Sequence, residues 1–287
     1  MEQEKQTPHP LEDIPLQDFV PTPTVASPTP QDCVSPETAA AQLEKYKIKM
    51  GTSIEIALKY LLPNDNWRLI PAAVGDVRGA ISLFELPEQA SPYYNLKAVA
   101  VCQGRASRYF HVIKDHDPHT RMPWDKNNVT HIQQMETYMA EEGEIVVVES
   151  TWKSGTYLFS DRHVLGIMSH HFDPELATYS LYFTTADHYH FKSPPSPSAP
   201  FGGGGGSVSA QVLLCVILRK LTDETTEVTI MLRINPNVSR FSTMSLFFEN
   251  KYKEELRKRV ALYEFVVQRW NDFYGPKNDP KKIENRR

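Results

Sequence analysis

The sequence predicts an α+β fold in which a curved antiparallel sheet wraps around one long C-terminal helix. Three observations lead to this prediction: a helical segment opens the patterned part of the chain, short β-type runs follow, and an amphipathic helix closes it. The runs are bounded by Pro, Gly or Asn, as is typical of strands joined by turns. Such a sheet packs on the helix, and an internal apolar cavity remains where the helix does not fill the concavity.

The first 35 residues differ in composition from the rest of the chain. They contain seven prolines and few apolar residues, and they show no hydrophobic period. This composition is typical of a solvated tail, so we expect residues 1–35 to be disordered. Residues 36–62 are dominated by Ala, Leu, Ile and Lys. They predict a helix with Pro36 in its first turn and a stop at Pro63, and Gly51 is a potential break in it.

Nine segments with the pattern of β-strands follow. One predicted helix lies between the third and the fourth of them. The helix is predicted over 104–114, where Ala106, Tyr109, Phe110 and Ile113 form one stripe. We expect the polar and proline residues of 115–123 to end this helix. The last strand alternates most clearly, with Val228, Ile230, Leu232 and Ile234 on one face and Glu227, Thr229, Met231 and Arg233 on the other. The predicted strands are 67–70, 78–86, 96–103, 129–140, 144–152, 163–172, 178–191, 210–220 and 226–234.

The C-terminal part of the chain contains a flexible insertion and the closing helix. Residues 193–207 combine prolines with five consecutive glycines and predict a loop. No helix follows these glycines, so the pattern of a phosphate-binding loop is absent. Residues 239–273 carry apolar side chains every three or four positions and end before Gly275 and Pro276, which predicts a long helix with one buried face. We therefore expect one domain over 36–275 and a flexible tail over 276–287.

Composition and charge exclude several classes of function. The net charge is −4 and the pI is near 6.2, without a Lys/Arg cluster that could follow a phosphate backbone, so nucleic acid is not an expected partner. Apolar stretches such as 212–218 are too short to span a bilayer, and the N-terminus carries acids and prolines in place of a signal sequence, so we expect a cytoplasmic protein. The cysteines Cys33, Cys102 and Cys215 are too scattered for a disulfide framework or a zinc cluster, and no cofactor is expected.

Several short motifs make the middle of the chain similar to a known family. These are the helix Ala106-Ser107-Arg108-Tyr109-Phe110-His111-Val112-Ile113, then Met122-Pro123-Trp124-Asp125, a hairpin, and Ser160-Asp161-Arg162-His163 at the start of a strand. Over about residues 62–273 the chain resembles START (steroidogenic acute regulatory protein-related lipid transfer) domains. It departs from them in two ways. The usual Arg-Asp step appears here as Asp-Arg-His, and the connection over 193–207 is longer.

The resemblance implies a function as well as a fold. The fold would be the helix-grip, in which the sheet encloses the C-terminal helix and a tunnel for one lipid of the sterol or phospholipid class. The protein would be a monomeric, non-enzymatic carrier that contacts membrane surfaces transiently. Enclosure is favourable because each methylene exposed to water costs about 0.8 kcal/mol, so ten of them cost about 8 kcal/mol. The final helix and the loop over 153–160 would form a movable lid.

The resemblance and the predicted strand faces indicate the residues that would contact the lipid. Glu149 shares a strand face with Ile145 and Val147, and it either meets a head group or a cation such as Arg162, or it faces solvent. The methionines would be flexible fillers of a cavity or of an ordinary core. Tyr157, Leu158 and Phe159 would dip into the membrane. The predicted tunnel residues are Glu149, Trp152, Arg162, Met168, Phe183, Met231, Arg233, Met244, Phe248 and Tyr252.

Other interpretations remain open at this point. Trp152, Tyr157, Tyr179 and Tyr182 either form an aromatic cage for a cationic head group or pack in the core. A metal site at His188 and His190 lacks a third ligand at a recognisable spacing, which favours surface histidines. An enzyme on the same architecture would use Glu149 with His163 or His171, although no nucleophile motif is present. A lipid-sensing scaffold that recruits partners through the Pro-rich tail is a further alternative.

Overall fold

The computed structural model describes residues 36–61, 66–71, 81–87, 91–141, 143–153, 161–187, 208–236 and 244–275. The two predicted tails and the predicted loop over 193–207 lie outside these ranges. The helices are α1 (Pro36–Leu61), α2 (Ala106–Lys114), α3 (Pro118–Asp125), α4 (Met244–Gln268) and α5 (Trp270–Tyr274). The strands are β1 (Arg68–Ile70), β2 (Ile81–Glu85), β3 (Tyr94–Gln103), β4 (Val129–Ala140), β5 (Gly143–Trp152), β6 (Arg162–Asp173), β7 (Thr178–Thr185), β8 (Val208–Ser209), β9 (Gln211–Lys220) and β10 (Thr225–Asn235).

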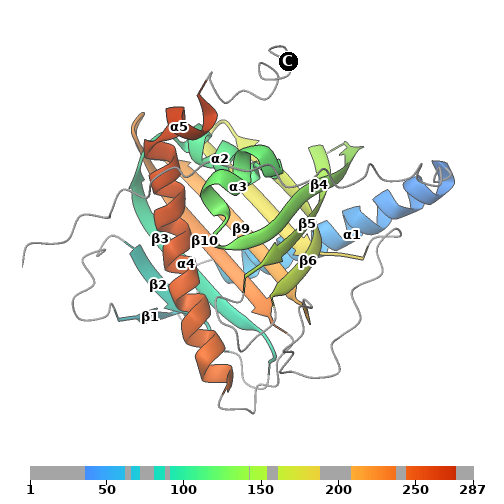
Figure 1. Cartoon of the computed structure of the whole chain (residues 1–287). Helices are drawn as coiled ribbons and strands as arrows, with labels where there is room; N and C mark the ends of the chain where they lie inside the picture. The colour runs from blue at the N-terminus through green and yellow to red at the C-terminus, as the bar shows by residue number, and fades with distance from the viewer. Residues whose placement is uncertain are drawn as a thin grey trace, which may run out of the picture.

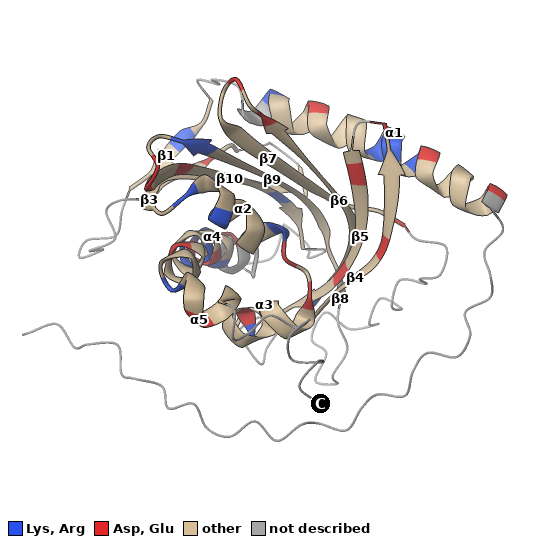
Figure 2. Cartoon of the chain, turned by 90° about the horizontal axis from the view of Figure 1, so that it is seen from above, with Lys and Arg blue, Asp and Glu red and all other residues tan. Residues whose placement is uncertain are grey.

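The described strands form one sheet, which confirms the predicted fold class. Its order is β1-β2-β3-β10-β9-β7-β6-β5-β4, with antiparallel neighbours throughout, and the short β8 pairs in parallel with β6. The sheet curves around α4 and α2, while α1 lies on the opposite, convex face (Figure 2). Helix α4 crosses the concave face diagonally, and α2 and α3 lie beside its C-terminal end (Figure 1).

Both faces of the sheet are buried, and each has its own hydrophobic core. Along β5, Val146 and Val148 point to the concave core, whereas Ile145 and Val147 join the convex core under α1. The convex core exists because α1 presents one buried stripe to β6, β7 and β9. That stripe consists of Gln42, Tyr46, Met50, Ser53 and Ala57. Gly51 lies on the exposed side of this continuous helix and does not break it.

The concave face is closed by the helices that follow β3 and β10. Helix α2 buries Ala106, Tyr109, Val112 and Ile113, close to the predicted stripe. Helix α2 ends at Lys114, as expected, but the sequence analysis did not predict α3, which occupies Pro118–Asp125. Proline is tolerated in its first turn, and the Asp117 carboxylate accepts a hydrogen bond from the backbone N–H of His119 at 2.8 Å.

The closing helix is shorter than predicted and is followed by a separate turn of helix. Helix α4 ends at Gln268, and α5 begins at Trp270. The predicted apolar stripe of α4 is confirmed where side chains are described, since Tyr252, Leu256, Val260, Tyr263 and Val267 are all buried against the concave core. Helix α4 is therefore one wall of the interior.

Strand β4 lies at one edge of the described sheet and is irregular. Its register against β5 shifts between Val129 and His131 and again between Gln134 and Glu136. These shifts are β-bulges or similar irregularities, which bend a strand and increase its twist. Several of its outward side chains are exposed, including Thr130, His131 and Thr137.

The junction between β3 and α2 depends on Gly104. This residue has φ of +120°, and a Cβ atom there would lie 2.4 Å from Cγ1 of Val267 on α4. We expect Gly104→Ala to lower the free energy of unfolding by about 1–3 kcal/mol, because the backbone would be strained and α4 displaced. Urea unfolding measures this. Gly51→Ala, at an open helical site, is the control and is expected to be neutral or stabilising. Equal effects of the two substitutions would contradict the packing argument.

Candidate functional site

A cavity of about 150 Å³ lies between the concave face of the sheet and α4. Its wall is mostly apolar and is built by strands β4, β5, β6, β7, β9 and β10 together with α4 and the α2–α3 region. The apolar lining residues are Ile113, Val129, Ile132, Val148, Trp152, Met168, Leu181, Phe183, Leu214, Val216, Ile230, Leu232 and Leu256. A concave, mostly apolar space with a few polar groups is the usual form of a small-molecule site.

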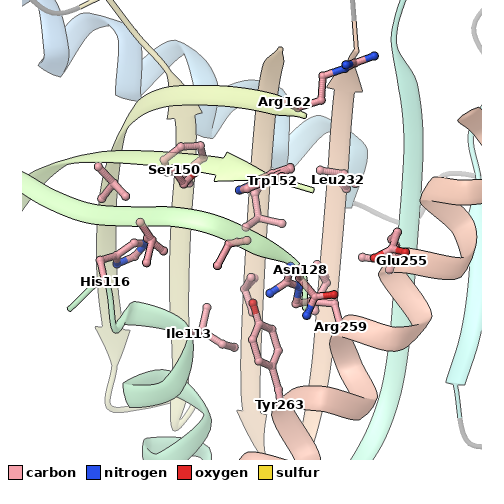
Figure 3. A pocket seen from close by; sticks show the side chains of 18 of the residues that line it. Ile113, His116, Asn128, Ser150, Trp152, Arg162, Leu232, Glu255, Arg259 and Tyr263 are labelled. Carbon is pink, nitrogen blue, oxygen red and sulfur yellow. The ribbon is translucent and has the colours of Figure 1, made fainter. Parts of the chain in front are cut away.

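Five of the predicted tunnel residues line this cavity. Trp152 comes from the end of β5, Arg162 and Met168 from β6, Phe183 from β7, and Tyr252 from α4. Figure 3 shows Arg162 and Trp152 on the sheet side, apart from the side chains that α4 contributes. The cavity thus brings together residues that are as many as 100 positions apart in the sequence.

Three predicted tunnel residues lie elsewhere. Met231 is buried in the convex core, Arg233 lines a second and more open groove of about 820 Å³ between α1 and the sheet, and Glu149 also belongs to the convex face. The alternation that placed Glu149 with Ile145 and Val147 was correct, but that face packs under α1. Because α1 buries the convex face, an apolar row on a strand does not identify the cavity side.

The remaining predicted contacts cannot be placed. The side chains of Met244 and Phe248, and the loop residues Tyr157, Leu158 and Phe159, lie outside the described part of the chain. In the sequence the last three fall between β5 and β6, whose described ends pair at Trp152 and Arg162. Among the cage residues, Tyr179 stacks on Phe110 at 4.8 Å, and Tyr182 belongs to the convex core. Neither joins Trp152 in the cavity lining.

The end of the cavity near Arg162 contains two cationic side chains, Arg162 and Lys251, with the carboxylates of Asp161 and Glu255 near them. The Arg162 side chain is buried, and it donates a hydrogen bond to the Tyr252 hydroxyl. Burial lowers the pKa of Arg162. Lys251 lies one residue before Tyr252, and burial also lowers its pKa, with Glu255 and Arg162 exerting opposite electrostatic effects. Both cations have therefore lost solvation on entering the cavity wall.

The other polar end of the cavity is a closed network around Asp125. This carboxylate is fully buried and accepts hydrogen bonds from Arg259 of α4 at 2.8 Å to each oxygen and from Arg121 of α3 at 2.9 Å. Asn128 adds a third donor at 2.8 Å. Burial raises the pKa of Asp125, but the guanidinium groups of Arg259 and Arg121 outweigh it, so the net pKa is lowered. The network ties α4 to α3.

Several lining residues were not predicted from the sequence. Ser150 and Asn128 are small polar residues on or near strand ends, and Arg121 and Arg259 belong to helices whose cavity faces are not distinguished by a local pattern. His116 also lines the cavity, and burial together with Arg121 lowers its pKa to about 3, so its ring is neutral. The helical period could have identified Arg259 as a lining residue, because it lies seven residues after Tyr252 and therefore on the same face of α4.

The candidate acid–base pair of an enzyme is present but faces away from the cavity. Glu149 Oε1 lies 2.9 Å from His163 Nε2, and Glu149 Oε2 lies 3.5 Å from His131 Nε2 and 3.2 Å from Gln133 Nε2. His171 is exposed on β6. The carboxylate is held in a salt-bridge cluster on the convex side of β4, β5 and β6, where it stabilises the sheet.

This cluster predicts a pH dependence of stability. Burial raises the pKa of Glu149, but hydrogen bonds from His131 and His163 lower it to about 2, below about 4.3 in an unfolded chain. Its contribution is therefore complete above about pH 4.3 and is lost as the pH falls through 2. The hydrogen bond to Glu149 raises the pKa of His131, so that contribution is complete below about pH 6.5 and is lost as the pH rises through the raised value.

We expect Glu149→Gln to lower the melting temperature most between about pH 5 and pH 6.5, where both contributions are present. The difference from the wild type should shrink towards pH 3. Thermal unfolding followed by circular dichroism across this range measures it. A difference that stays constant from pH 3 to pH 8 would contradict the ionic nature of the cluster.

Two negative findings concern the described residues alone. They contain no group of three His, Cys, Asp or Glu side chains arranged to hold a metal ion. His188 and His190 lie outside them. No helix in the described ranges combines the length and the apolar character that crossing a membrane requires.

The arrangement of the sheet, α4 and the cavity between them can be compared with solved structures. Human StAR-related lipid transfer protein 5 superposes with a TM-score of 0.61 over 82% of this chain and 99% of its own, at 16% sequence identity. The fold is START-like. Human STARD10 gives a TM-score of 0.56 at 14% identity, over 89% of this chain and 90% of its own. The human StarD13 lipid transfer and protein localization domain gives 0.53 at 11% identity, over 82% and 98%.

Comparisons of the sequence, unlike those of the fold, identify no related protein. No family model matches the sequence, and no curated protein does. Identities of 11–16% to the solved structures establish a START-like, helix-grip architecture and nothing about the ligand.

Proposed function

We propose that this protein binds one lipid, of the sterol or phospholipid class, in the cavity under α4 and carries it between membranes. The observation that carries the proposal is the apolar cavity between sheet and helix in a START-like fold. Human StAR-related lipid transfer protein 5 is by its name a lipid transfer protein, and the chain covers 99% of it. We further propose a monomeric, non-enzymatic protein of the cytoplasm that contacts membranes peripherally.

The size of the cavity requires motion during uptake. At about 150 Å³ it is smaller than the roughly 300–1,000 Å³ of sites for drug-sized ligands. A whole lipid therefore enters only if the wall moves. We infer that α4 is the element that moves, because it crosses the concave face beside α2 and forms the cavity wall opposite the sheet (Figure 1). Each methylene that reaches the cavity gains about 0.8 kcal/mol.

Native mass spectrometry of the purified full chain tests this proposal, followed by extraction and identification of whatever is bound. One lipid per chain supports a carrier, and labelled lipid moving between donor and acceptor vesicles completes the case. Binding without vesicle transfer would favour a lipid-sensing scaffold. A folded protein that retains no lipid and takes up neither cholesterol nor phosphatidylcholine would contradict the proposal.

A further inference from the structure

The open groove of about 820 Å³ lies between α1 and the convex face of the sheet, opposite the face that α4 covers (Figure 2). We call it the α1 groove. Its sheet side combines apolar side chains such as Leu165 and Leu213 with polar ones such as Thr184. Its helix side consists of Gln42, Lys45, Tyr46, Lys49, Ser53 and Ile56. The α1 groove therefore offers both apolar contacts and positive charge.

Two exposed lysines of α1, Lys45 and Lys49, line this groove without an ion-pair partner in the described part of the chain. They lie four residues apart on one side of the helix, where like charges repel each other. No acidic residue stands three or four positions from either of them. Lys47, by contrast, pairs with Glu44 at 2.8 Å. An anion placed between the two lysines would relieve their repulsion.

The other charged residues of the groove lining do not supply that anion. Arg233 donates a hydrogen bond to Asn95 Oδ1 at 3.0 Å, and His163 Nε2 lies 2.9 Å from Glu149 Oε1. Asp187 is the single carboxylate among the described lining residues, and no ion pair joins it to either lysine. Two ammonium groups thus meet one carboxylate across the groove.

The N-terminal tail has the complementary composition. Residues 1–35 contain six acidic residues and one basic residue. Within them, 11–20 reads Leu-Glu-Asp-Ile-Pro-Leu-Gln-Asp-Phe-Val, with three carboxylates, five apolar side chains and no cation. The other two long segments outside the described ranges differ, since 188–207 contains no Asp or Glu and 276–287 contains five basic and two acidic residues. Charge complementarity therefore favours 11–20.

The tail is also long enough to reach the groove. Phe19 precedes Pro36, the first residue of α1, by 17 positions, and a flexible chain of that length spans about 20–25 Å on average. Lys49 lies 13 residues beyond Pro36, which is about 20 Å along the helix axis. Because the tether length matches this distance, the effective concentration of the segment at the groove is on the order of millimolar.

We propose that the segment 11–20 docks in the α1 groove of its own chain. Its three carboxylates pair with Lys45 and Lys49, and its apolar side chains cover the sheet side of the groove. Exposed ion pairs contribute little affinity, so the apolar contacts stabilise the docked segment and the charges fix its position. The inference does not depend on the proposed function, because the lipid cavity lies on the opposite face of the sheet.

Carbodiimide cross-linking of the full-length protein tests this contact, because the reagent joins an ammonium group to a carboxylate that touches it. Digestion and mass spectrometry identify the joined residues. We expect the carboxylates of 11–20 to join Lys45 and Lys49 at least about fivefold more often than Lys126, an exposed lysine outside the groove. The exposed pair of Lys47 with Glu44 shows that the reagent has acted.

An equal mixture of unlabelled and nitrogen-15-labelled protein identifies the chain that supplies the segment. A cross-link within one chain joins two light or two heavy peptides, and we expect these pairs alone. Pairs of one light and one heavy peptide would mean that a second copy fills the groove, which would overturn the proposal.

Variants of the tail separate docking from random contact. Ile14→Ser combined with Phe19→Ser removes apolar contacts but keeps every carboxylate, and should reduce the cross-links to the two groove lysines at least about fivefold. Val25→Ser combined with Val34→Ser is the matched control, because these apolar residues belong to the same tail but lie outside 11–20. It should keep the full yield.

Two further results would overturn the docking of this segment. One is an unchanged yield in Ile14→Ser/Phe19→Ser. The other is the absence of cross-links between the tail and the groove lysines while Lys47 joins Glu44. Both leave the lipid carrier untouched, since its test concerns the cavity under α4.

Discussion

Asp125→Asn is expected to destabilise the protein by about 3–5 kcal/mol, the cost of removing one partner from a buried ion pair. The carboxylate is fully buried, and Arg121 and Arg259 both depend on it. The amide keeps the shape but loses the charge, so both guanidinium groups lose the anion that they share. Urea unfolding monitored by tryptophan fluorescence measures the change.

Asp223→Asn is the matched control for this prediction. Asp223 also pairs with a cation, Lys220, but its side chain is 83% exposed, so we expect no measurable change in stability. The Asp125 variant should also let α4 open more readily, because Arg259 ties α4 to α3. Hydrogen exchange of α4 amides would rise more than that of β9 amides. Unchanged stability in Asp125→Asn would show that the network contributes little.

Ser150→Trp is expected to weaken lipid binding by about 100-fold while the fold persists. Ser150 lies on the cavity side of β5 and is 4% exposed, so an indole at this position occupies the space of the ligand (Figure 3). If the ring displaces only four methylene groups, the loss is about 3 kcal/mol, or about 100-fold in affinity. Binding of a fluorescent lipid analogue measures the loss, and far-ultraviolet circular dichroism verifies the fold.

Thr137→Trp controls for the effect of a large aromatic side chain on a strand. Thr137 lies on β4 and is exposed, away from the cavity lining. This variant should bind lipid as the wild type does. Normal binding by Ser150→Trp would mean that the ligand lies elsewhere, and the groove between α1 and the sheet would then be the next candidate.

The sequence predicts which residues are buried in elements that have one buried and one more exposed face. The alternation of 226–234 separated the two faces of β10, because Glu227 and Thr229 are more exposed than Val228 and Ile230. It did not identify the cavity side, since the predicted tunnel residue Met231 lies on the opposite face. The period of α4 likewise identified its buried stripe. Both patterns are local, and both report a contrast between core and solvent.

The sequence does not predict which strand face lines the cavity when both faces are buried. It also does not predict contacts between residues that are far apart in the chain. Residues 145–150 of β5 are buried on both faces, so Val147 and Val148 look alike although only Val148 lines the cavity. Helix α3 was hidden by Pro118 and Pro123, which usually terminate helices. The pairing of Asp125 with Arg259 joins residues 134 positions apart, and no local pattern reports it.

The irregular edge strand β4 has a consequence for the behaviour of the protein at high concentration. An unpaired strand edge can template pairing with another chain and start aggregation. Here the two register shifts break the regular spacing of backbone donors and acceptors. The exposed side chains of Thr130, His131 and Thr137 are polar, whereas Met139 near the end of the strand is exposed and apolar. A neighbouring copy that paired with β4 would find the ladder interrupted at both register shifts. Extended edge-to-edge association along β4 is therefore disfavoured.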